Sequence, residues 1–86
     1  MTGPLKTEEM KVTIVSPERT IFEGEVSSVT VPGEKGRFEV LRNHAPIISC
    51  LQKGTILCSG KETQTFDITS GFIEVANNEI SICVEV

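Results

Sequence analysis

The end of the chain alternates between apolar and mostly polar side chains with a strict period of two. The apolar members, which share one face of an extended segment, are Ile80, Ile82, Val84 and Val86. Ser81, Cys83 and Glu85 fall on the opposite face. A period of two is typical of a β-strand with one buried face and one face in water. Segment 79–86 is therefore predicted to be a half-buried strand.

The same alternation recurs in shorter segments of the first half. Met10, Val12 and Ile14 are separated by polar residues, and similar patterns occupy 28–31 and 37–40. Turn-forming residues stand between such segments: Ser16-Pro17, Gly24, Pro32-Gly33, Gly36, Asn43, Pro46, Gly54 and Ser70-Gly71. Short strands at intervals of roughly 8–12 residues, with turn signals between them, are typical of sandwiches and barrels. Because no long segment has the period of a helix, the sequence predicts an all-β domain.

Two dipeptides predict hairpins. Asn77-Asn78 separates 71–76 from the last strand, and asparagine tolerates the positive φ that a two-residue hairpin turn requires. Ser59-Gly60 separates 55–58 from 61–68 in the same way. The polar start of 61–68 predicts a hairpin tip that lies in solvent.

Length and charge exclude several classes of protein. The 86 residues allow one small domain, with 1–9 interpreted as a loose extension and 10–86 as the domain. Eight Lys and Arg stand against twelve Asp and Glu, for a net charge of −4. Phosphate binding needs clustered basic side chains, so this balance argues against nucleic acid and anionic membrane surfaces as partners. No apolar run approaches the roughly 20 residues of a membrane span, and the start of the chain does not have the apolar core of a secretory signal.

The three cysteines, Cys50, Cys58 and Cys83, are odd in number and show no paired spacing. This pattern does not suggest a disulfide framework. We interpret them as small hydrophobic residues of the core, in a reducing compartment. The core assignment is firmer for Cys58 than for Cys83, because Cys83 falls on the polar face of the last strand.

We find no motif for catalysis, cofactor binding or metal binding. Segment 54–62 is only superficially like a phosphate-binding loop, since five residues separate its glycines and Glu62 replaces the Ser or Thr that would bind magnesium. His44 is the only histidine. One histidine with scattered cysteines makes a poor zinc set. The sequence therefore predicts no catalytic, cofactor or metal site.

A series of blocks carries a more specific signal than the alternation. In chain order they are Val15-Ser16-Pro17-Glu18, Phe22 to Val26, Val29 to Gly36, Leu41 to Pro46, Ser70 to Val75, and Asn78. Together they resemble the N-terminal domain of the ε subunit of F-type ATP synthase, called δ in mitochondria. The resemblance covers about Met10 to Val86 and implies a flattened antiparallel β-sandwich of about ten short strands. Arg42 and Ser70 depart from the family pattern, which often has proline and glycine there.

The resemblance implies a central-stalk subunit, a rotor part that couples the c-ring to the γ subunit during ATP synthesis. The positions matching the c-ring contact are Arg37, Phe38, His44, Ala45 and Pro46. The positions matching the γ contact are Ser16, Ile21, Phe22, Ser49 and Leu51. Phe22 fits the core as well as the interface. Arg37 stands where the family often has an acidic residue, which implies a different charge partner on this c-ring.

In the family a two-helix C-terminal domain usually follows the sandwich, and this sequence stops at Val86, where that domain would begin. Inhibition of ATP hydrolysis and, in some members, ATP binding depend on those helices, so we expect a subunit that couples without regulating. The resemblance also implies a non-catalytic subunit without a cofactor. It would lie at the cytoplasmic face of the inner membrane, reach that membrane only through the complex, and form no obligate homo-oligomer.

Two other functions stay open from the residues alone. One is a stand-alone small β-barrel binding module, for example for oligonucleotides, against which the net charge and the lack of Tyr and Trp count. The other is a small hydrolase that pairs His44 with a nearby Ser or Cys.

Overall fold

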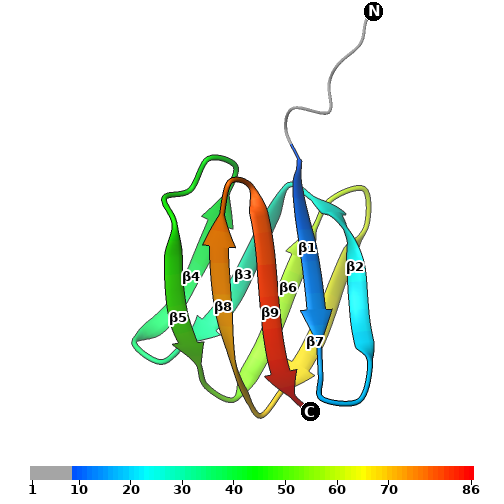
Figure 1. Cartoon of the computed structure of the whole chain (residues 1–86), viewed down its shortest axis with the longest axis vertical. Helices are drawn as coiled ribbons and strands as arrows, with labels where there is room; N and C mark the ends of the chain where they lie inside the picture. The colour runs from blue at the N-terminus through cyan, green and yellow to red at the C-terminus, as the bar shows by residue number, and fades with distance from the viewer. Residues whose placement is uncertain (1–8) are drawn as a thin grey trace, which may run out of the picture.

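The computed structural model describes residues 9–86, which form nine β-strands and no helix (Figure 1). In chain order the strands are β1 Met10–Val15, β2 Thr20–Val26, β3 Ser28–Gly33, β4 Gly36–Leu41, β5 Ile47–Leu51, β6 Gly54–Ser59, β7 Thr63–Ile68, β8 Ser70–Ala76 and β9 Glu79–Glu85. The predicted all-β sandwich is confirmed. Residues 1–8 of the predicted extension lie outside the described residues.

The strands form two layers that are joined at one corner (Figure 1). The first layer runs β2-β1-β9-β8-β5, and the second runs β4-β3-β6-β7. Gly33 of β3 pairs with Leu51 of β5 and connects the layers. All neighbouring strands are antiparallel except β1 and β9, which are parallel and lie at the centre of the first layer.

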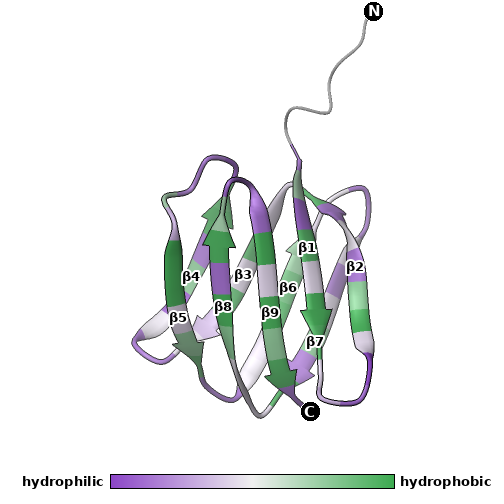
Figure 2. Cartoon of the chain, viewed as in Figure 1, coloured by the Kyte–Doolittle hydropathy of each residue, from purple (hydrophilic) through white to green (hydrophobic). Residues whose placement is uncertain are grey.

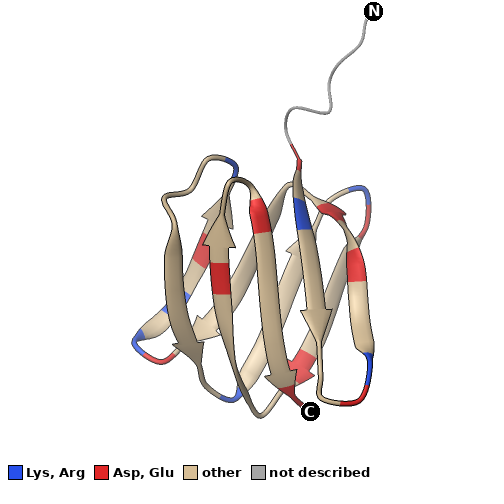
Figure 3. Ribbon diagram, viewed as in Figure 1, with Lys and Arg blue, Asp and Glu red and all other residues tan. Residues whose placement is uncertain are grey.

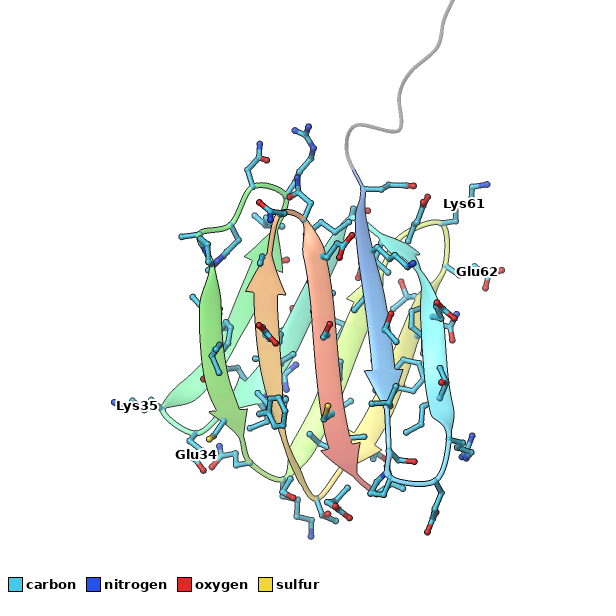
Figure 4. All side chains as sticks on the ribbon, in the orientation of Figure 1. Glu34, Lys35, Lys61 and Glu62 are labelled. Atoms are coloured by element: carbon cyan, nitrogen blue, oxygen red, sulfur yellow. The ribbon has the colours of Figure 1, made fainter. Side chains whose placement is uncertain are left out.

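Both predicted hairpins are confirmed. β8 and β9 pair up to Ala76 and Glu79, and Asn77 and Asn78 form the turn with φ values of 53° and 61°. Two consecutive positive φ angles give the turn whose twist matches that of the flanking strands. β6 and β7 close at Ser59 and Thr63, and the tip between them projects into solvent with Lys61 and Glu62 exposed (Figure 4).

The apolar face of each alternating segment points between the two layers, and Figure 2 shows the alternation along the strands. Ile80, Ile82 and Val84 are buried as predicted, whereas Val86 follows the end of β9 and is 70% exposed. The rest of the core comes from Met10, Val12, Ile14, Val26, Val29, Val31, Val40, Leu51, Ile56, Cys58, Ile68, Ile73 and Val75. No polar or charged side chain among the described residues is buried, so the interior is a packing core.

Two strands carry too little alternation to stand out in the sequence. Gly24 was expected in a turn but lies inside β2, where it pairs with Val12 between the exposed Glu23 and Glu25 at the edge of the layer. β5 exposes Ile48 and Cys50 on its outer side. Both strands are defined by pairing with a neighbour. Within residues 9–86, no helix is long and apolar enough to cross a bilayer.

Candidate interaction surface

Four strands of the first layer bring four apolar side chains into line on its outer face. In register, Val15 of β1 lies opposite Cys83 of β9, Cys83 opposite Phe72 of β8, and Phe72 opposite Cys50 of β5. We call Val15, Cys83, Phe72 and Cys50 the apolar row. Phe72 is 44% exposed, and Cys50 is exposed as well. Side chains alternate between the faces of a strand, so this row faces away from the core.

Ile48 extends the apolar surface along β5. It lies two residues before Cys50 on the same side of the strand and is 74% exposed. A single exposed aliphatic residue is ordinary on a protein surface. Here Ile48 continues a row that crosses four strands, which makes this face a candidate interaction surface.

Hollows lie on and beside the row. An almost entirely apolar hollow of about 300 Å³ is lined by Ser16 and Pro17 together with three members of the row, Val15, Cys83 and Phe72. At the β5 end, a hollow of about 480 Å³ is lined by Arg37, Phe38 and Ser49. A third hollow, of about 370 Å³, lies beside Pro46, Ile48 and Ala76. The surface is therefore uneven enough to receive protruding side chains of a partner.

The structure places the five residues predicted to contact γ in three environments. Ser16 and Ser49 line two different hollows. Ile21 and Phe22 are half-buried in β2 and pack against the core, and the Phe22 ring lies 5.4 Å from that of Phe66, centroid to centroid. Leu51 is only 2% exposed and belongs to the core. Its side chain lines no surface of the domain, which removes it from the candidate set.

The hydroxyl of Ser16 has a structural role besides its position. Its Oγ donates to the carbonyl oxygen of Arg19 at 3.2 Å and accepts from the backbone N–H groups of Glu18 and Arg19, both at 3.3 Å. The turn between β1 and β2 is thereby closed by a side chain, which holds Pro17 beside the hollow.

The five residues predicted to contact the c-ring fall into two groups along the chain. Arg37 and Phe38 lie at the start of β4, whereas His44, Ala45 and Pro46 follow its end. At about 3.3 Å per residue, strand β4 alone keeps these groups more than about 10 Å apart. The Arg37 Nη1 donates to the carbonyl oxygen of Thr55 at 2.9 Å, so its guanidinium extends over the second layer towards β6, away from His44.

His44 is half-buried in the loop between β4 and β5. Its Nδ1 lies 2.8 Å from the carbonyl oxygen of Ala45, and since a carbonyl only accepts, the proton is on Nδ1. Within the described residues, no hydroxyl, thiol or carboxylate hydrogen-bonds to the His44 ring. Among the described residues, His44 therefore has neither the nucleophile nor the carboxylate partner of a catalytic triad.

The cysteines occupy three different environments. Cys58 is buried, as predicted, and burial raises the pKa of its thiol from 9.0 to about 11. Cys83 is half-buried and Cys50 is exposed, so the core interpretation is wrong for these two, which have the outward register and belong to the apolar row. Over residues 9–86, no group of three or more His, Cys, Asp or Glu side chains could hold a metal ion.

The sequence analysis missed the apolar row, although a signal was present. Phe72 and Cys83 each occupy the outward phase of a strand whose other outward residues include Glu74 in β8 and Ser81 in β9, and on β5 the outward residues are Ile48 and Cys50. An apolar residue on a polar face is an exception to the alternation. Only the register of β1, β9, β8 and β5 shows that these exceptions are neighbours.

Comparisons with known proteins agree over nearly the whole chain. Residues 9–86 match the family described as the ATP synthase delta/epsilon chain, beta-sandwich domain. ATP synthase epsilon chains of Leptospira interrogans and Maricaulis maris are 35% and 46% identical to it, over 94% and 91% of this chain. The chain spans 65% and 59% of those two relatives. An epsilon chain of Caulobacter vibrioides is 40% identical over 90% of this chain and 91% of its own length.

Solved structures show the same fold. A chain of the Euglena gracilis mitochondrial ATP synthase superposes with a TM-score of 0.84 over 98% of this chain and 59% of that one, at 18% identity. A chain from the central stalk and c-ring of the Tetrahymena thermophila mitochondrial ATP synthase gives a TM-score of 0.76 over 95% and 67%, also at 18% identity. By its sequence and its two-layered fold, the chain belongs to the ATP synthase delta/epsilon family, as the β-sandwich domain of that family.

Proposed function

We propose that this chain is a central-stalk subunit of an F-type ATP synthase, which couples the c-ring to the γ subunit. Family membership supports this role, and so does the presence of similarly folded chains in ATP synthase structures that include the c-ring. The observation that carries the proposal is the apolar row with Ile48, which gives the outer face of one layer an exposed apolar surface.

The apolar row is the proposed docking surface for γ. Removing a large apolar side chain from water contributes about 1.5–3 kcal/mol. Phe72 and Ile48 are exposed in this chain, so much of that free energy would be gained only when γ covers them. Ser16 lines the hollow that also contains Val15 and Phe72, whereas Ser49 has the inward register of β5 and adjoins this surface only through the hollow at the edge of that strand. Pro46 shares a hollow with Ile48, so we also assign the segment 44–46 to the γ side.

The proposed c-ring contact is the turn between β3 and β4. Glu34 and Lys35 project into solvent at its tip (Figure 4), and Arg37 follows at the start of β4. Charged, exposed side chains suit contact with polar loops, because such a contact can be made and broken without exposing apolar surface. In this proposal the residues that the resemblance assigned to the c-ring are divided, with Arg37 on the c-ring side and the segment 44–46 on the γ side.

In this proposal the chain supplies no catalytic group to the complex. Among residues 9–86, neither His44 nor the exposed Cys50 is hydrogen-bonded to a side chain that could act with it in nucleophilic catalysis. The chain would lie beside the membrane as part of the complex, on the side where γ meets the c-ring.

Binding to γ tests the proposal. Phe72→Ser and Ile48→Ser should each weaken binding of purified γ by about tenfold or more, because each removes apolar area from the contact. The matched control is Leu41→Ser, which removes a large exposed side chain (51%) from the other layer. It should leave γ binding unchanged. A folded wild-type chain that does not bind γ, or variants that all bind equally, would refute the proposal.

A further inference from the structure

The outer face of the first layer, which carries the apolar row, is predominantly acidic. The outward-facing carboxylates of the first layer are Glu23, Glu25, Glu74, Glu79 and Glu85. In the described part of this face, Lys11 is the only basic side chain, and it lies 4.0 Å from a carboxylate oxygen of Glu23. Figure 3 shows the red segments on β2, β8 and β9 and the uncharged length of β5.

Two of these carboxylates flank the apolar row directly. Glu74 lies opposite Ile48 across the β5–β8 pair and two residues from Phe72 on the same strand. On the other side of Phe72, Glu85 lines the hollow that Phe72 shares with Val15 and Pro17. Both glutamates are exposed, and neither carboxylate pairs with a described side chain. Phe72 is thus an exposed aromatic ring between two uncompensated negative charges.

We infer that the γ surface that covers the apolar row presents an apolar strip with Lys or Arg side chains on both of its sides, opposite Glu74 and Glu85. The inference rests on the proposed function, because it describes the chemistry of the partner at the same surface. A neutral or acidic partner would leave two carboxylates facing no counter-charge at the rim of an apolar contact. Like charges facing each other across an interface are strongly unfavourable, whereas complementary charges fix orientation and accelerate encounter.

The test compares two pairs of charge-neutral variants. In the first, Glu74→Gln and Glu85→Gln are combined, which keeps size and removes both charges beside the row. In the control, Glu39→Gln and Glu62→Gln remove two exposed charges from the second layer and its hairpin tip. Association with purified γ is followed by stopped-flow fluorescence at about 50 mM and about 300 mM salt, since screening separates the two regimes.

The first pair should lower the association rate constant about three- to tenfold at low salt and flatten its salt dependence. The control pair should match the wild-type rate and salt slope. If both pairs behave alike, or if Glu74→Gln with Glu85→Gln binds faster, the inference is overturned while docking on the apolar row stands. Failure of the proposed function would give a different result. Phe72→Ser would then bind γ as well as the wild-type chain does, at both salt concentrations.

Discussion

Asn43 and Asn78, 35 residues apart in the sequence, form a reciprocal pair of hydrogen bonds that we call the clasp. The backbone N–H of Asn43 donates to Oδ1 of Asn78 at 2.6 Å, and Nδ2 of Asn78 donates to Oδ1 of Asn43 at 3.2 Å. Both residues have positive φ, 66° and 61°. The backbone carbonyl of Asn78 also accepts from the N–H of Lys11 at 3.0 Å. One side chain of the β8–β9 turn therefore fixes the loop that carries His44.

Asn78→Gly should lower the free energy of unfolding by about 1–2 kcal/mol, because it removes both side-chain hydrogen bonds and leaves the Asn43 amide unpaired. Glycine accepts the positive φ, so the backbone adds no strain. Urea denaturation measures the loss, and faster hydrogen exchange at the Asn43 amide locates it.

The neighbouring turn residue provides the control for that variant. Asn77 has a φ of 53° and is exposed, so Asn77→Gly makes the same chemical change without removing the clasp. It should change stability by less than about 0.5 kcal/mol. Equal losses in the two variants would show that the turn conformation matters and the clasp does not.

Gly71→Ala should destabilise the domain by about 2–4 kcal/mol, in the range of substitutions that overfill a packed site. A Cβ at Gly71 would overlap the carbonyl oxygen of Cys83 and lie 3.2 Å from Cα of Val84. Both contacts are on β9, which pairs with β8 at this point. Thermal unfolding measures the effect, with Ser70→Ala as the adjacent control. A Gly71→Ala melting temperature like that of wild type would contradict the close approach.

Stability should fall as the pH rises from about 9 towards 11, in part because of Cys58. Burial raises the pKa of its thiol from 9.0 to about 11, so the folded state keeps this proton at pH values where the unfolded chain releases it. Its contribution is complete below about pH 9 and is lost as the pH passes 11. Urea titrations at several pH values measure this loss.

Cys58→Ala isolates the contribution of the thiol from every other source of pH dependence. The variant should be less stable at pH 7, because it loses buried volume, but its stability should decline less steeply above pH 9. Parallel pH profiles for the two proteins would exclude a contribution from Cys58.

Phe22 and Phe72 should separate folding from docking. Phe22 packs against the core and its ring meets that of Phe66 at a tilt of 46°, so Phe22→Ala should lower the free energy of unfolding by about 2–3 kcal/mol. It should leave γ binding intact under conditions where the variant is folded. Phe72→Ala should do the reverse: it should weaken γ binding and leave the free energy of unfolding nearly unchanged.

A double-mutant cycle of Phe22 with Phe66 should give a coupling free energy of about 0.5–1.5 kcal/mol. Zero coupling would contradict the ring contact.

Much of the fold follows from local chemistry that the sequence displays. The alternation in 79–86 predicts which side chains of β9 are buried, and Asn77-Asn78 predicts the hairpin that precedes it. Buried aliphatic residues and turn residues act over a few positions, so their consequences can be seen in the sequence. β2 and β5 were harder to detect, because their pairing partners define them more than their own pattern does.

The sequence by itself determined that residues 9–86 form a β-domain of its family, where most of its turns lie and which apolar faces form its core. Only the tertiary structure decided the candidate surface. The parallel pairing of β1 with β9 and the antiparallel pairing of β8 with β5 bring Val15, Cys83, Phe72 and Cys50 into one row. The same packing buries Leu51 and places Arg37 and His44 at opposite ends of β4. The physical reason is that strand order and register depend on contacts between residues far apart in the chain, which no local pattern encodes.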